Sequence, residues 1–153
     1  MQFHLDEESL VRANAQFWEQ MLGMQMETVP FAEEFCVSPG HVVVSVNLFG
    51  VWNGRIEVRM AKELAQATTA AMLMQPVETV VEADTLDATR EVVNMIAGIL
   101  KTSLPPSSMT VPESEISDEL LCSRMHGENT LTVAFRHEFG GLLVRVREEN
   151  TAH

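Results

Sequence analysis

The sequence predicts an α+β domain built from two similar halves, each with a long helix packed on antiparallel strands. Two observations predict this class: apolar residues recur at helical spacing in long segments, and they alternate with polar residues in pairs of shorter segments. A third observation is that helix and hairpin follow one another in the same order twice. The 153 residues, 46% of them hydrophobic and 21% charged, suit a single domain over 1–153.

Three helices are expected. The first covers about 5–22, where acids fill the first turn, apolar residues follow at helical spacing and a glycine can end the helix. The second is alanine-rich, covers 61–74 and ends before Pro76. The third covers about 84–103 and ends where Pro105 and the next proline cannot continue it.

Strands are expected in two hairpins. Residues 41–50, HVVVSVNLFG, and 54–60, GRIEVRM, alternate apolar and polar residues and join through a turn that contains glycine. The end of the chain repeats this plan, with TLTVAFRHEF and LLVRVRE on either side of two glycines. Shorter strands are expected near Phe35 and after Pro112.

The likeness of the two halves, roughly 1–75 and 76–153, predicts an internal repeat. Superposing the first and third helices at an offset of 78 residues aligns three pairs of positions: Ser9 with Asp87, Ala13 with Glu91, and Gln16 with Asn94. One sequence does not prove a duplication, because hairpins resemble one another in any case.

Charge and composition exclude several functions. The formal charge is −12, from 22 acids against 10 Lys and Arg, and no basic cluster exists that could bind a nucleic acid or an anionic membrane. The first ten residues, MQFHLDEESL, are acidic where a secretion signal is basic and apolar, and no apolar run is long enough to span a membrane. We therefore expect a cytoplasmic protein whose partner is a protein with a basic docking site or an apolar contact surface.

Motifs predict no metal site and no nucleophilic catalyst. The five histidines form no i,i+4 pair, and GxSxG, Walker and GxGxxG sequences do not occur. Cys36 and Cys122 lie far apart among apolar residues without a CxxC companion, so reduced, buried thiols are expected rather than a disulfide. The segment RHEF at 136–139 is expected to be a turn.

The third helix carries an unusual polar stripe. On a helical wheel with about 100° per residue, Asp87, Glu91, Asn94 and Gly98 fall within an arc of about 60°. The aliphatic residues spread over the opposing side: Val92, Val93, Ile96, Ile99 and Leu100. The helix should therefore bury its aliphatic side and expose the polar stripe, where Gly98 leaves room for a close approach. A plain solvated face is the alternative, because an exposed Asn costs a helix only about a few tenths of a kcal/mol.

The run Asp87-x3-Glu91-x2-Asn94, with Gly98 behind it, resembles the (Asp/Ser)-x3-Glu-x2-Asn helix of the CheC/CheX/FliY phosphatases of bacterial chemotaxis. The segment EVVNMIAGILKTSL looks particularly like the CheX form of that helix. The family is also similar in length and in its duplicated plan, so the resemblance covers almost the whole chain. It implies the CheC/CheX-like fold, one active site per chain and a homodimer, although no residue in the sequence decides the oligomeric state.

The resemblance implies a phosphatase that acts on the aspartyl phosphate of a CheY-type response regulator. This partner brings its own acidic pocket, Mg²⁺ and lysine, so the chain needs no cofactor or metal of its own. Asn94 would hold a water in line with the phosphorus, as the glutamine of a small GTPase does, and Glu91 would pair with the lysine. Asp87 would support that contact, and Arg90 and Lys101 would relieve the repulsion between two acidic surfaces.

Departures from the family pattern leave alternatives open. The pattern ends in a proline about two dozen residues after the Asn, whereas SEISDE occupies that region here and Pro112 comes earlier. In the first helix, Ala13 stands in the place of Glu and Gln16 in the place of Asn. One alternative is a non-catalytic domain that binds a signalling or flagellar partner. Another is a structural domain, which would be favoured if Asn94 were buried against its own chain.

Overall fold

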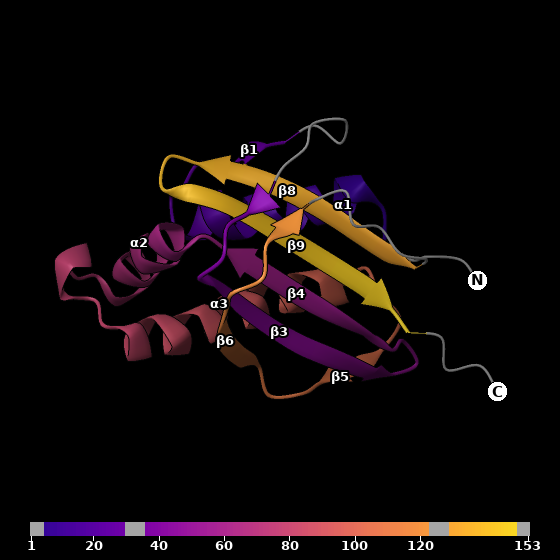
Figure 1. The fold of residues 1–153 in the computed structure, drawn as a ribbon. Coiled ribbons are helices and arrows are strands. Elements are labelled where there is room, and N and C mark those ends of the chain that lie inside the picture. Colours follow the sequence, from indigo (N-terminus) through magenta and orange to yellow (C-terminus); the bar gives the residue numbers. More distant parts are fainter. Residues whose placement is uncertain (1–4, 30–35, 123–128, 150–153) are drawn as a thin grey trace.

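The computed structural model describes residues 5–29, 36–122 and 129–149, and it confirms the α+β class (Figure 1). Its helices are α1 (Glu7–Ala15), a π-helical continuation (Gln16–Met21), α2 (Lys62–Leu73), a 3-10 turn (Val77–Thr79) and α3 (Glu82–Lys101). Its strands are β1 (Glu27–Thr28), β2 (Cys36–Val37), β3 (His41–Gly50), β4 (Gly54–Met60), β5 (Ser107–Met109), β6 (Glu113–Ser117), β7 (Leu121–Cys122), β8 (Thr130–His137) and β9 (Gly140–Glu148).

The strands form one large antiparallel sheet and one small one. The large sheet has the order β1-β8-β9-β4-β3-β5, and β6 pairs with β3 beside β5. The two predicted hairpins, β3–β4 and β8–β9, meet in the middle of the sheet, where β4 and β9 pair with Val58 opposite Val144. This symmetric arrangement is the one a repeat would give, but the duplication itself stays a prediction.

The small sheet pairs β2 with β7 and sets Cys36 opposite Cys122 in the backbone register. The distance between the two cysteines in the sequence indicated that they are remote from each other. In the fold, their backbones are neighbours. The burial and state of their thiols lie outside the described part of the structure.

The predicted boundaries of the long elements hold with small shifts. The first helix starts at Glu7, where the side chain of Asp6 caps it by accepting the N–H of Ser9 at 2.7 Å. It is not α-helical throughout, because it continues as a π-helix from Gln16. The third helix lies two residues earlier than expected at both ends. At its C-terminal end, the N–H groups of residues 102–104 bond only three residues back and tighten the last turn. Sequence reasoning missed β1, β5 and β7, which have two or three residues each.

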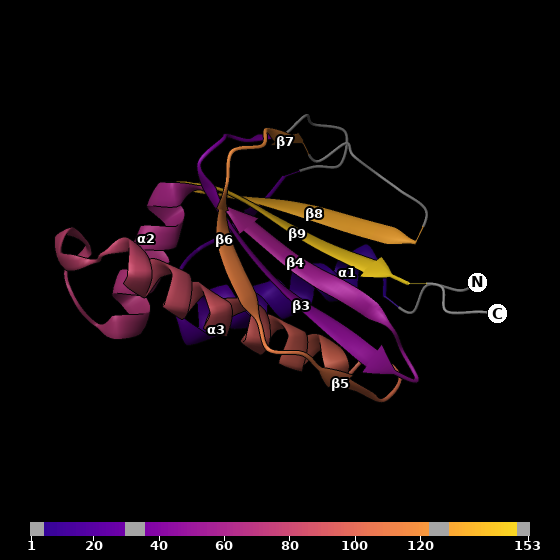
Figure 2. The same ribbon diagram turned by 60° about the horizontal axis from the view of Figure 1, so that its bottom comes forward.

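The main core lies between the sheet and the pair of helices α1 and α3, which cover the same face (Figure 2). Alternate residues of each long strand point to this face, as the period of two requires. On β3 these are Val42, Val44, Val46 and Leu48, each at most 2% exposed. No helix within the described ranges is long and apolar enough to cross a membrane.

The opposite face of the central strands carries a charged network around Glu57. Its carboxylate accepts the Nε–H of Arg59 at 2.9 Å and lies 3.7 Å from Arg55 and 3.9 Å from Arg145. Arg59 also approaches the ring nitrogen Nε2 of buried His41 at 3.1 Å. Burial raises the pKa of Glu57, but the hydrogen bond and the three positive charges outweigh this effect and hold its pKa below the ordinary value.

We expect Glu57→Gln to lower the free energy of unfolding by about 3 kcal/mol at pH 7, because three arginines lose their counter-charge in a largely buried place. Since the folded-state pKa is depressed, this stabilisation is present above about pH 4.5 and is lost as the pH falls toward the folded-state value. The gap between wild type and variant should therefore shrink in acid. Urea unfolding at pH 7 and at a pH below about 4.5 measures this difference in the free energy of unfolding. Glu115→Gln, at an exposed position, is the control.

Candidate functional site

Helix α3 has the two faces that the helical wheel predicts. The side chains of Val92, Val93 and Ile96 are fully buried, and Leu100 is 2% exposed. On the other side, the exposed positions are Asp87, Glu91 and Gly98, with Asn94 partly buried among them. We refer to Asp87, Glu91, Asn94 and Gly98 as the α3 stripe.

The acids of the α3 stripe differ in their partners. Asp87 forms an ion pair with Arg90, three residues along the helix, so its charge is partly neutralised. In the described part of the chain, the carboxylate of Glu91 forms no ion pair or hydrogen bond. Lys101, the last residue of α3, is partly buried one turn beyond Gly98. Glu91 is therefore the acid of the stripe that is ready to meet a cation from outside.

The carboxamide of Asn94 is also free. Within the described ranges it donates and accepts no hydrogen bond, and it is not among the buried polar atoms that lack a partner. Its polar atoms are thus solvated, which is the state expected of a group that acts on a partner. An Asn that is buried against its own chain, the condition that would favour a purely structural reading, would have to bond to that chain.

The glycine of the stripe has open space in front of it. A Cβ atom built on Gly98 meets no atom within 4 Å, and this glycine has an ordinary helical backbone. Neither packing nor backbone conformation therefore requires glycine at this position. The absence of a side chain leaves the helix backbone open to close approach one turn after Asn94.

Pro112 lies beside α3, in a β-bulge. Between the pairs Ser45–Glu113 and Leu48–Met109, two residues of β3 face three residues, 110–112. The extra residue is a bulge, a feature that tolerates proline at a sheet edge. Pro112 and Arg90 line the same pocket of about 340 Å³, so the proline that comes early in the sequence still lies next to the helix, one turn before Asn94.

The corresponding positions of the first helix differ from the α3 stripe in residue type and in burial. Gln16 is exposed and Ser9 partly exposed, but Ala13 between them is 4% exposed and belongs to the main core. The buried Asn14 next to it is occupied structurally, since it donates to the carbonyl of Leu10 and accepts the indole N–H of Trp18. The α1 positions therefore lack both the acid and the outward stripe of α3.

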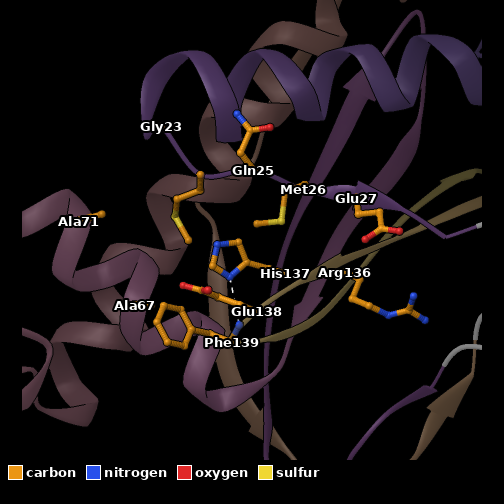
Figure 3. Close-up of a pocket in the computed structure, with 11 residues that line it drawn as sticks. Gly23, Gln25, Met26, Glu27, Ala67, Ala71, Arg136, His137, Glu138 and Phe139 are labelled. Atoms are coloured by element: carbon orange, nitrogen blue, oxygen red, sulfur yellow. Dashed lines mark hydrogen bonds between the residues drawn. The ribbon is translucent and has the colours of Figure 1, made fainter.

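A pocket of about 850 Å³ lies elsewhere, between the segment after α1, helix α2 and the β8–β9 turn (Figure 3). None of the predicted site residues lines it. Its wall includes His137, whose Nδ1 accepts the backbone N–H of Phe139 at 3.1 Å. The turn expected over 136–139 is shorter than predicted, because Arg136 and His137 still belong to β8 and only residues 138–139 turn. This pocket is hollow but offers no arrangement of groups that matches the predicted chemistry.

One family model and several solved structures match the chain. The family model "Chemotaxis phosphatase CheX" matches residues 42–136, while the search of curated proteins gives no match. Among solved structures, CheX of Vibrio vulnificus is 14% identical with a TM-score of 0.75, covering 97% of this chain and 100% of its own. CheX of Desulfovibrio desulfuricans is 23% identical with a TM-score of 0.71, covering 93% and 97%. CheX in the CheX–CheY–BeF₃–Mg²⁺ complex of Borrelia burgdorferi is 22% identical with a TM-score of 0.70, covering 94% and 97%.

Proposed function

The chain belongs to the chemotaxis phosphatase CheX family, and on this premise we propose that it hydrolyses the aspartyl phosphate of a CheY-type response regulator. The observation that carries the proposal is the pair Glu91 and Asn94 on the exposed side of α3, both without partners in the described part of the chain. A CheX protein of similar fold is known in complex with CheY, BeF₃ and Mg²⁺, which supports a regulator of this type as the partner.

Asn94 has the chemistry to orient the attacking water. Its carboxamide oxygen accepts a hydrogen bond from the water and its amide group donates to the phosphoryl oxygens. The water oxygen attacks phosphorus, the bond between phosphorus and the aspartyl oxygen breaks, and the carboxylate leaves with the bond electrons. Both protons of the water end on the phosphate product. The Mg²⁺ that the regulator carries would neutralise the phosphoryl charge. Helix α3 then has to orient the attacking water and does not have to supply a positive charge.

Glu91 acts one turn before Asn94 as the anchor. A carboxylate that pairs with the regulator's lysine fixes the distance and direction from which Asn94 enters the pocket. The ion pair between Asp87 and Arg90 lowers the negative charge that the stripe brings to an acidic pocket. Lys101 would contribute in the same direction from the other end of the helix.

The direct test is the decay of a phosphorylated CheY-type regulator in Mg²⁺ with and without the protein. Acceleration that saturates with regulator concentration would support the phosphatase. A regulator that binds but decays at its own rate would instead support the non-catalytic alternative, in which the fold serves contact alone.

The open space at Gly98 gives a separate prediction. Gly98→Ala should raise the free energy of unfolding by about 0.5–1 kcal/mol, because alanine favours a helix and the added methyl meets nothing. The same methyl stands where the partner approaches, so kcat/KM for dephosphorylation should fall several-fold. Chemical denaturation and the decay assay measure the two effects. Unchanged kcat/KM in the stabilised variant would show that the partner does not reach Gly98.

A further inference from the structure

The connection between α2 and α3 exposes a cluster of large apolar side chains. Leu73 is 45% exposed, Met74 92%, Val77 45% and Val81 57%. We refer to these four residues as the apolar tip. They lie within nine positions of the chain, at the end of α2 and in the connection to α3, which runs along the left edge of Figure 1. Apolar residues that are scattered singly on a surface need no explanation, whereas several large ones exposed in one short connection point to an interaction site.

The conformation of Met74 strengthens this reading. Met74 ends α2 in the left-handed region with φ of 54°, and its N–H bonds to the carbonyl of Ala70. Helices usually use Gly or Asn at such a position, because a larger side chain is strained there. The chain instead carries methionine, whose side chain contributes almost nothing to the core. Packing within the chain does not explain this choice, whereas contact with a partner does.

The charges around the tip restrict the partner. Residues 63–89 contain no Lys or Arg. The acids of this segment are Glu63, Glu78, Glu82, Asp84 and Asp87. An anionic membrane would be repelled, and so would the same tip of a second copy, because a two-fold contact brings two acidic rims together. The complementary surface is that of a protein with apolar side chains flanked by Lys or Arg.

The tip adjoins the N-terminal end of the helix that carries the α3 stripe. Val81 precedes α3 directly, and the 13 residues from Val81 to Asn94 span about 20 Å of helix. A standard interface of about 800 Å² per partner is roughly 30 Å across. One small domain can therefore cover both the stripe and the tip.

We propose that the apolar tip is a second docking contact for the response regulator that engages Glu91 and Asn94. This inference rests on the proposed function. The tip binds an apolar, basic-rimmed patch of the regulator outside its phosphorylation pocket. The tip thus sets affinity and choice of regulator, while Asn94 sets the rate of the chemical step.

The test is the double variant Met74→Asn, Val77→Thr. Asn suits the left-handed position, so the variant should melt no lower than wild type. Its Kd for a regulator activated with beryllium fluoride and Mg²⁺ should rise at least tenfold, and KM should rise in parallel. The kcat at saturation should stay within twofold. Val51→Thr is the control, since Val51 is 74% exposed at the β3–β4 turn, the opposite end of the molecule in both views.

The outcomes separate this inference from the proposed function. A tip variant with wild-type Kd and KM would overturn the docking contact and leave the phosphatase intact. A tenfold loss of affinity in the tip variant, with a wild type that binds the regulator and does not dephosphorylate it, would support the contact and overturn the enzyme. A wild type that does neither would overturn both.

Discussion

Asn94→Ala is expected to reduce the accelerated dephosphorylation of the regulator by at least about 100-fold, which is the effect of removing one preorganised group at a reacting centre. The carboxamide makes no hydrogen bond within the described part of the chain, so its loss leaves no broken contact behind. Alanine also favours the helix more than asparagine does, and the melting temperature should not fall. The loss should appear in kcat, with the Kd for a beryllofluoride-activated regulator nearly unchanged.

Two further variants define what Asn94 does. Asn94→Gln keeps the carboxamide but moves it by one methylene, and a displacement of about 1 Å can cost about 100-fold in rate. It should therefore recover little of the activity. Asn47→Ala removes an exposed carboxamide from β3 and should have no effect on kcat. Full activity in Asn94→Ala would contradict the assignment of the water to this residue, even if the protein proves to be a phosphatase.

The long elements of the fold could be predicted because their periodicity is local. Alternation alone located β3 and β4, and the wheel of α3 separated the buried Val92 and Ile96 from the exposed Glu91. A side chain that must face either core or solvent leaves this signal in a single segment. The predicted stripe could therefore be found before any coordinates, although the roles of its residues stay predictions.

The rest of the fold could not be predicted because it depends on contacts between distant segments. The strands β1 and β7 have two residues each, too few for a period, and the facing positions of Cys36 and Cys122 arise only from the pairing of β2 with β7. The bulge at Pro112 follows from a register that changes by one residue along β3. None of these features has a signature within one segment of sequence.

The apolar tip was missed for a different reason. The helix expected over 61–74 includes Leu73 and Met74, and its alanine-rich sequence does not indicate which of its residues are exposed. Whether an apolar residue is inside or outside depends on what covers it, and here the helix ends at Leu73 with Met74 turned into solvent. The signal that could have pointed to it is the run of Val77, Val80 and Val81 between Pro76 and the acidic start of α3, an apolar run in a connection that composition predicts to be polar.

Glu91→Gln is expected to reduce kcat/KM about 30-fold or more, because under the proposed function it removes the charge from one partner of an interfacial pair and leaves the regulator's lysine without its counter-ion. The cost should appear mainly as a higher Kd and a faster dissociation rate. Glutamine keeps the length and helix preference of glutamate, so the fold should be unaffected. A pair that is desolvated in the complex is poorly screened, and the ratio between wild type and variant should persist at high salt.

A difference between wild type and Glu91→Gln that persists at high salt distinguishes a specific ion pair from a general effect of net charge. Glu7→Gln changes the net charge by the same amount on an exposed position of α1 and should alter association only slightly, with a difference that disappears as salt is added. If Glu91→Gln behaved in the same way as Glu7→Gln, Glu91 would be acting through the long-range field of an acidic protein, and the anchor that aims Asn94 would have to be another group. If Glu91→Gln raised the Kd and Asn94→Ala lowered only kcat, two residues of one helical turn would have separate roles. Glu91 would act in binding the regulator and Asn94 in the chemical step.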